Sequence, residues 1–167
     1  MITKNDLLKT LEAPLLYWST ASKELISLFF GKKAADMVGF DQRSPHHCYT
    51  LFEHCIHTVD HINSEANNVM TDADLLRVAA FFHDIAKPQV AFEKNGRLVF
   101  YGHAHKSADM AEGLLINLGF DTEEINLICF FIKHHDDFIS YELPDEVRNK
   151  NNNSLAEITK ERILKHI

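Results

Sequence analysis

The chain has 167 residues, of which 46% are hydrophobic and 25% charged, as is usual for one soluble globular domain. Its formal net charge of −7 and its lack of a dense Lys/Arg stretch argue against binding of long nucleic acids. No run approaches the roughly 18 consecutive apolar residues of a membrane span, and the polar N-terminus is unlike a secretory signal. The three cysteines are an odd number and lack the spacing of a disulfide framework, which indicates free thiols in a reducing compartment. We therefore expect a cytoplasmic protein.

The first half of the chain carries apolar residues at steps of three and four, which predicts helices. Ser19 or Thr20 is suited to cap the second helix, and Gly31 is suited to end it. Thr71 with Asp74 resembles a capping box that opens a buried helix. The predicted helices cover residues 4–13, 19–30, 32–38, about 50–69 and a segment from Thr71 to near His83, with a loop at 39–45.

The second half combines one hairpin with further helices. Pro88 cannot continue the helix before it, and Asn95-Gly96 between short apolar runs predicts a β-hairpin near residues 90–100. Asp121 with Glu124 resembles a second capping box. Further helices are expected at residues 104–118, 122–134 and 155–166, with a polar segment at 148–154. We therefore predict an all-α fold in a single domain over residues 1–167, with this one small β-hairpin.

The apolar run that ends in His83-Asp84 is the most informative part of the sequence. Residues 79–82 are apolar, His83 and Asp84 follow directly, and Lys87 comes three positions after Asp84. Polar groups at the wall of a hydrophobic core cost desolvation free energy unless they are paired or bind a metal. Where the backbone turns at a helix end, both side chains can reach one ion. The alternative is a histidine favoured by the helix dipole beside a loop aspartate.

Three histidines share one face of the helix that begins near residue 50, namely His54, His57 and His61. His54 is flanked by apolar residues and is expected to face inward, as a metal ligand or as a buried core histidine. His57 and His61 form an i,i+4 pair that can bind a metal, or they are surface residues.

Two later segments repeat the pattern of histidine at a helix end. His103 and His105 open a helix, where neutral metal-binding imidazoles suit the dipole better than charged ones. His134-His135-Asp136 ends an apolar helix much as the earlier His-Asp pair does. Eleven histidines, several of them at helix ends, indicate a metal site.

The order of these residues resembles the HD superfamily of metal-dependent phosphohydrolases. The matching positions are His54, His83-Asp84-Ile85-Ala86-Lys87-Pro88, Gly102-His103 and His135-Asp136. The chain is most similar to the HD domain of bacterial CCA-adding tRNA nucleotidyltransferases, because residues 41–54 resemble that group's lead-in to the first ligand. The resemblance covers roughly residues 40–137. It implies an N-terminal helical extension at 1–40, a metal-site core at 41–137 and a C-terminal tail or helix at 138–167.

The resemblance implies a site for one or two divalent ions. The implied metal ligands are His54, His83, Asp84, His103 and His135. The first three would bind one ion, and the last two would complete a second or a wider site, with His134 as the alternative to His135. Mixed imidazole and carboxylate ligands favour Mn, Fe, Co, Ni or Zn over Mg.

The resemblance also implies roles in catalysis. Asp84 would orient the attacking water, Lys87 would contact the substrate phosphate, and His47 would line the pocket. We therefore expect a phosphohydrolase that acts on a nucleotide or another small phosphoester, as a phosphomonoesterase or phosphodiesterase, through a metal-bound hydroxide. The alternative is a catalytically degenerate HD domain that serves as a metal- or nucleotide-binding regulatory module.

The sequence departs from the family pattern in two ways. The family's last ligand is an aspartate on a later helix, and no aspartate follows residue 145. Either Asp136 or Asp137 substitutes, or the site lacks one ligand, or the natural protein continues beyond this chain. The first 40 residues cannot contain a nucleotidyltransferase head, so we do not expect this chain to catalyse CCA addition.

Overall fold

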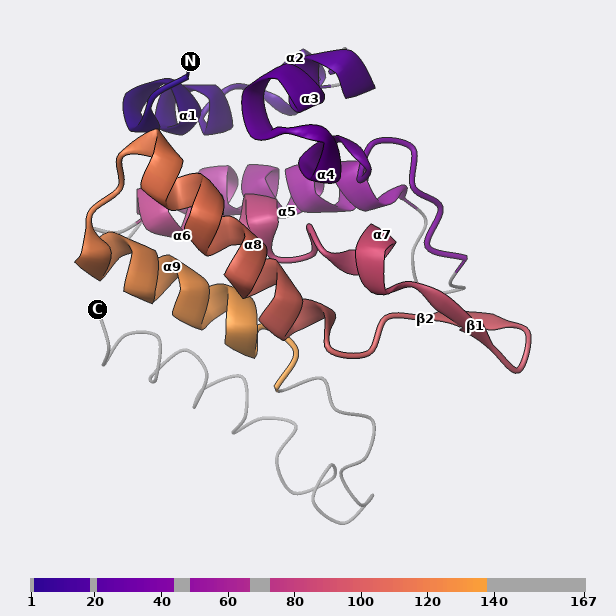
Figure 1. Cartoon of the computed structure of the whole chain (residues 1–167). Helices are drawn as coiled ribbons and strands as arrows, with labels where there is room; N and C mark the ends of the chain where they lie inside the picture. The colour runs from indigo at the N-terminus through magenta and orange to yellow at the C-terminus, as the bar shows by residue number, and fades with distance from the viewer. Residues whose placement is uncertain (1, 19–20, 44–48, 67–72, 138–167) are drawn as a thin grey trace. The chain divides into compact units, whose positions relative to one another are not determined.

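The computed structural model describes residues 2–18, 21–43, 49–66 and 73–137. The chain divides into two compact units, Met1–His134 and His135–Ile167. The described part of the first unit is mostly helical with one hairpin, which confirms the predicted fold class (Figure 1). Its elements are α1 (Lys4–Leu11), α2 (Leu15–Trp18), α3 (Lys23–Phe30), α4 (Lys32–Ala35), α5 (Leu51–Ala66), α6 (Ala73–Phe82), α7 (Lys87–Val90), β1 (Phe92–Lys94), β2 (Arg97–Val99), α8 (His103–Leu118) and α9 (Thr122–His134).

The predicted hairpin is confirmed. Strands β1 and β2 pair antiparallel, with Lys94 opposite Arg97, so Asn95 and Gly96 form a two-residue loop. Both loop residues have positive φ, 52° and 74°, as a type I′ turn requires. The Asn-Gly signal therefore set both the position and the register of the hairpin.

Several helix ends differ from the prediction. Helix α1 ends at Leu11 rather than at residue 13, because Pro14 disfavours helical geometry at the residue before it. A short helix, α2, follows that the sequence pattern did not predict. Helix α3 begins at Lys23, and the hydroxyl of Ser22 caps it by accepting from the Leu25 N–H, at 3.2 Å. The predicted caps Ser19 and Thr20 lie outside the described residues.

The remaining boundaries follow the prediction more closely. Helix α4 ends at Ala35, before the expected residue 38. Asp121 and Glu124 form the predicted capping box, with backbone-to-carboxylate distances of 2.9 and 3.0 Å. The first predicted box lies partly outside the described residues, since Thr71 is not described. Asp74, the other residue of that predicted box, forms an ion pair with Arg77. The predicted segments at 148–154 and 155–166 are also outside the described part.

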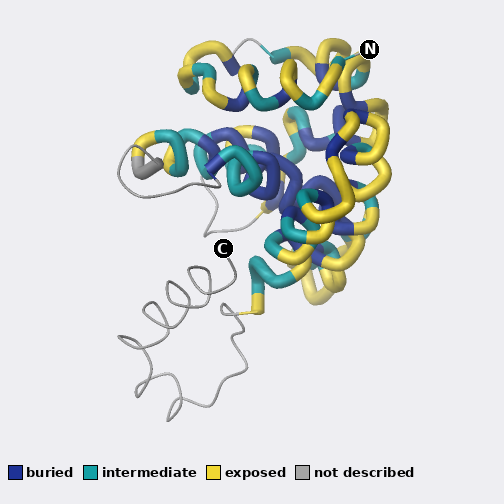
Figure 2. The backbone as a smooth tube through the Cα atoms, turned by 90° about the vertical axis from the view of Figure 1, so that its left-hand side faces the viewer, coloured by how far each residue is buried: buried dark blue, intermediate teal, exposed yellow. Residues whose placement is uncertain are grey.

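The core of the first unit is built around the C-terminal half of α6. Phe81 places its ring centroid 5.6 Å from that of Trp18, 5.3 Å from Phe30 and 6.3 Å from Phe52. Helix α6 packs against α5 and α9, and α8 lies along α9. Buried residues lie on the inner sides of these helices (Figure 2). The end of α6 is therefore anchored from several sides, which fixes the position of the His-Asp pair that follows.

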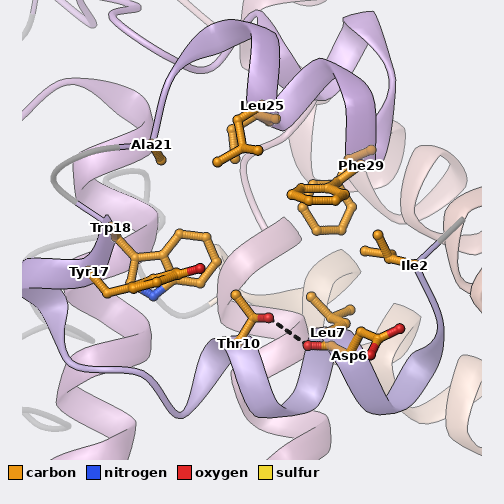
Figure 3. Close-up of a pocket in the computed structure, with 11 residues that line it drawn as sticks. Ile2, Asp6, Leu7, Thr10, Tyr17, Trp18, Ala21, Leu25 and Phe29 are labelled. Atoms are coloured by element: carbon orange, nitrogen blue, oxygen red, sulfur yellow. Dashed lines mark hydrogen bonds between the residues drawn. The ribbon is translucent and has the colours of Figure 1, made fainter.

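A cavity of about 450 Å³ lies among α1, α2 and α3 (Figure 3). Its wall is mostly apolar and includes Leu7, Trp18 and Phe29. None of the candidate site residues that the structure describes lines it. No helix within the described ranges has the length and apolar character needed to cross a membrane.

Two glycines, one within α8 and one directly after it, should respond oppositely to substitution by alanine. Gly119 has φ +88° and caps the helix, so Gly119→Ala should destabilise the protein by about 1–2 kcal/mol. Gly113 lies exposed within the helix with open space where a methyl group would be added, so Gly113→Ala should stabilise it by about 0.5–1 kcal/mol. Chemical denaturation of the two variants measures both effects. Shifts of the same sign would contradict the assigned conformations.

Candidate metal centre

Asp84 lies in a tight turn directly after α6 and is almost fully buried. The turn is closed by the Lys87 N–H, which donates to the Asp84 carbonyl at 3.0 Å. The N–H of buried Ala86 donates to the Ser107 hydroxyl of α8 at 3.1 Å, which fastens the turn to a second helix. The backbone therefore holds the Asp84 carboxylate inside the fold.

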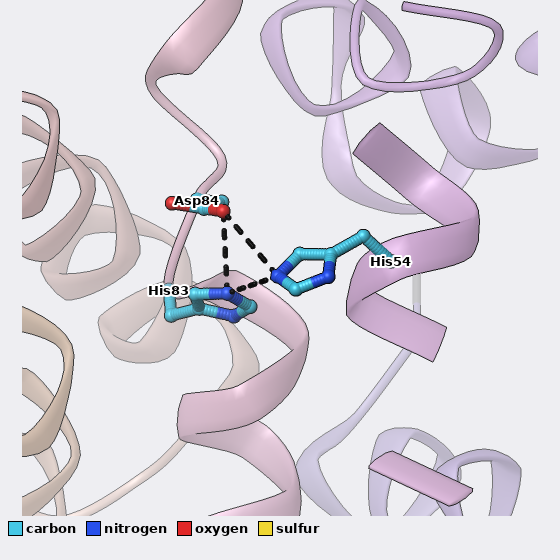
Figure 4. Close-up of side chains that lie close together, drawn as sticks. All are labelled: His54, His83 and Asp84. Atoms are coloured by element: carbon cyan, nitrogen blue, oxygen red, sulfur yellow. Dashed lines mark hydrogen bonds and ion pairs between the residues drawn. The ribbon is translucent and has the colours of Figure 1, made fainter. Parts of the chain in front are cut away.

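Three imidazole rings direct Nε2 atoms toward this carboxylate. His83 Nε2 lies 3.3 Å and His54 Nε2 lies 3.7 Å from Asp84 Oδ2, and the two Nε2 atoms are 3.1 Å apart (Figure 4). His103 Nε2 lies 3.1 Å from the other carboxylate oxygen, Oδ1. The groups come from α5, the end of α6 and the start of α8. The structure thus brings together four side chains from three separate segments of the sequence.

Backbone carbonyls fix the tautomers of two of these rings. Nδ1 of His83 lies 2.7 Å from the Ala80 carbonyl, and Nδ1 of His103 lies 2.9 Å from the Phe100 carbonyl. A carbonyl only accepts, so each Nδ1 must carry the proton. In the neutral ring, Nε2 then presents a lone pair to the Asp84 carboxylate. This arrangement is repulsive unless a proton or a metal cation lies between the two groups.

The charge around Asp84 also favours a cation. Burial is the largest single influence on the pKa of His83 and lowers it, but the adjacent Asp84 carboxylate and Cys55 together outweigh burial, so the pKa of this imidazole lies well above its ordinary value. An imidazolium and a metal ion are alternative ways of supplying the same positive charge. Backbone carbonyls that hold Nδ1–H are also typical partners of metal-binding histidines.

The donor atoms have the spacing of a metal site. Ligand atoms of His54, His83 and Asp84 all lie within 4.8 Å of one another. Bonds of about 2.0–2.2 Å to a common ion place neighbouring donors about 3.0–3.5 Å apart. The measured separations of 3.1 and 3.3 Å fit this range, and that of 3.7 Å needs only a small ring movement. The residues present therefore fit a divalent ion.

Lys87 is buried beside the same carboxylate. Its ammonium lies 2.7 Å from Asp84 Oδ2, donates to Gln42 Oε1 at 3.0 Å, and stands 5.4 Å from the centroid of the Phe100 ring. Gln42 is only 1% exposed. Gln42 lies in the predicted loop at 39–45 and was not among the predicted site residues, because no periodic pattern marks a buried polar residue in a loop.

The other predicted residues lie as follows. His135 is the first residue of the second unit, where its Nε2 lies 3.4 Å from Asp136 Oδ1. His134 ends α9 and packs its ring on Phe130, with centroids 4.6 Å apart. The choice between His134 and His135, and the roles of Asp136 and Asp137, stay predictions. His47 lies outside the described residues. His57 stacks on Tyr49, and His61 is exposed.

A comparison with known protein families identifies the family of this chain. The family model of the HD domain matches residues 51–166, and the chain belongs to the HD domain family. The resemblance found in the sequence is therefore confirmed, and it places the chain in a superfamily of metal-dependent phosphohydrolases.

The chain is similar over most of its length to a curated relative. Over 147 residues the chain is 29% identical to a CC-adding tRNA nucleotidyltransferase of Thermus thermophilus. The alignment covers 86% of this chain and 32% of that protein, so the chain spans about a third of the relative's length. No solved structure gives a significant match.

Proposed function

We propose that this HD domain is a metal-dependent phosphohydrolase that acts on a nucleotide or another small phosphoester. The observation that carries the proposal is the convergence of three imidazole Nε2 atoms on the buried Asp84 carboxylate. Burying these groups together costs free energy that a bound cation offsets. The expected substrate is small and phosphorylated, and we place the activity in the cytoplasm. Nucleotidyl transfer, which the name of the Thermus relative describes, is not part of the proposal.

We assign the first ion to His54, His83 and Asp84. His103 faces the other oxygen of the carboxylate, and we propose that it completes a second or wider site with His135. Such a donor set favours Mn, Fe, Co, Ni or Zn over Mg. A divalent ion held there lowers the pKa of a water molecule that it binds and neutralises phosphate oxygens.

The surrounding residues bind and orient the substrate in this proposal. Asp84 accepts a hydrogen bond from the attacking water and so fixes its direction. The Lys87 ammonium has three N–H donors. Among the described residues, the Asp84 carboxylate and the Gln42 side-chain oxygen accept from two of them. The third is left for a phosphate oxygen, where it adds positive charge. His47 is assigned to the wall of the substrate pocket.

A second candidate function is a metal- or nucleotide-binding regulatory module without turnover. The observation in its favour is the spacing of the His54, His83 and Asp84 donors, which fits an ion whether or not a substrate is turned over. In this alternative the ion and Lys87 hold a phosphate group without activating water for attack. Binding without hydrolysis would then be the whole activity.

Metal analysis and a substrate screen test the proposal. Protein purified without chelator should contain a transition metal, and with Mn or Co it should hydrolyse a phosphomonoester, a phosphodiester or a nucleotide. Chelation should lower the melting temperature, since an ion at about 100 times its Kd stabilises the folded state by about 2.7 kcal/mol. Metal binding without turnover on any substrate would rule out the hydrolase and support the regulatory module. Absence of metal binding would rule out both the hydrolase and a metal-binding module.

A further inference from the structure

The metal centre is most open beside His54. Side-chain exposure is 30% for His54, against 11% for His83 and 12% for His103, and only 1% for Asp84. A substrate whose phosphate reaches the carboxylate must therefore place the rest of its atoms along the α5 side of the site. The groups next to His54 on α5 are the ones that can recognise them.

An aromatic pair stands one helical turn from His54 on the same face of α5. His57 follows His54 by three residues, which places their Cβ atoms about 5–6 Å apart. The Tyr49 ring stacks on the His57 ring, with centroids 4.0 Å apart and an interplanar angle of 24°. Tyr49 is 43% exposed, so a ring of this pair remains accessible to solvent.

The chain next to Tyr49 is held in place by the start of α5. The N–H and the hydroxyl of Thr50 both donate to the Glu53 carboxylate, at 2.9 and 2.8 Å. This bond pattern orders the residue that directly follows Tyr49. The aromatic pair is therefore presented on an ordered helix start rather than on a free loop, which lowers the entropy lost when a ligand stacks on it.

Resting on the proposed function, we infer that Tyr49 and His57 form a stacking platform for the base of a nucleotide substrate. The platform and the metal centre are separated by one helical turn, a gap that the sugar of a nucleotide can bridge. Flat, accessible aromatic rings bind bases through their π-faces with little preference among them. The site would therefore select nucleotides over phosphoesters without a base, and it would accept several different bases.

Binding of two ligands that differ only in the base tests this inference. The full chain, loaded with Co, is titrated with a nucleoside 5′-monophosphate and with ribose 5-phosphate by calorimetry. The wild type should bind the nucleotide more tightly, and Tyr49→Leu should weaken nucleotide binding by roughly 5- to 150-fold. Binding of ribose 5-phosphate and of Co alone should not change. Tyr49→Phe should retain the nucleotide preference, and Tyr17→Leu, at an exposed tyrosine of α2, should have no effect.

The outcomes separate this inference from the proposed function. A wild type that binds Co and hydrolyses phosphoesters but binds the two ligands equally would overturn the platform alone. Equal weakening of both ligands in Tyr49→Leu would show that the pair only stabilises the start of α5, and it would overturn the platform as well. Absence of Co binding in the wild type would instead be a failure of the proposed function.

Discussion

The variant Asp84→Asn should lose the metal and the hydrolytic activity together. Asparagine keeps the shape of the side chain but removes the charge that three Nε2 atoms and the Lys87 ammonium share. Because the carboxylate is the central donor, metal affinity should fall by about 100-fold or more. Turnover of any phosphoester that the wild type hydrolyses should become undetectable. Calorimetric titration with Mn or Co measures the first effect and a phosphoester assay the second.

The same variant should also lower the stability of the metal-free protein. Lys87 would remain buried without its counter-charge, and breaking a buried pair from one side costs about 3–5 kcal/mol. The double variant Asp84→Asn/Lys87→Met removes both charges and should recover most of that loss without recovering metal binding. This control separates unfolding from loss of a ligand. Metal affinity of Asp84→Asn equal to that of the wild type would contradict the proposed site.

The sequence was sufficient for most of the fold and for the centre of the site. The apolar run before His83-Asp84 predicted a buried helix that ends in polar groups, and α6 has that form. Asn95-Gly96 and the Asp121–Glu124 pair each act through local backbone chemistry, so their effects could be read from neighbouring residues alone. Local signals of this kind do not depend on the rest of the fold.

Features that depend on tertiary contact or on the exact course of the backbone could not be predicted. Gln42 lies in a loop, and only its contact with Lys87 across 45 residues gives it a place in the site. The tautomers of His83 and His103 depend on carbonyls three residues earlier in each case, and these bonds require the observed backbone turns. The stack of Tyr49 on His57 likewise depends on how the backbone enters α5. Spacing in the sequence gives no signal for such contacts.

The variant Lys87→Met should separate metal binding from phosphate binding. The ammonium lies 2.7 Å from Asp84 Oδ2 and repels a cation there, so its removal should leave metal affinity equal to or higher than that of the wild type. Methionine retains most of the side-chain volume against Phe100. Loss of the positive charge near the phosphate should lower kcat/KM by about 10²- to 10³-fold. Steady-state kinetics at saturating Mn, together with metal titration, measures both quantities.

The metal dependence of stability gives Lys87→Met a second readout. Without metal, the buried Asp84 carboxylate lacks the ammonium that neutralises it, so the variant should be less stable than the metal-free wild type. A bound ion supplies the missing positive charge, and the melting temperature should therefore rise more on addition of Mn in the variant than in the wild type. Lys9→Met, at an exposed lysine of α1, should change neither value. Loss of metal in Lys87→Met equal to that in Asp84→Asn would contradict the separate roles assigned to the two residues, because the lysine would then be needed to hold the ion rather than the substrate.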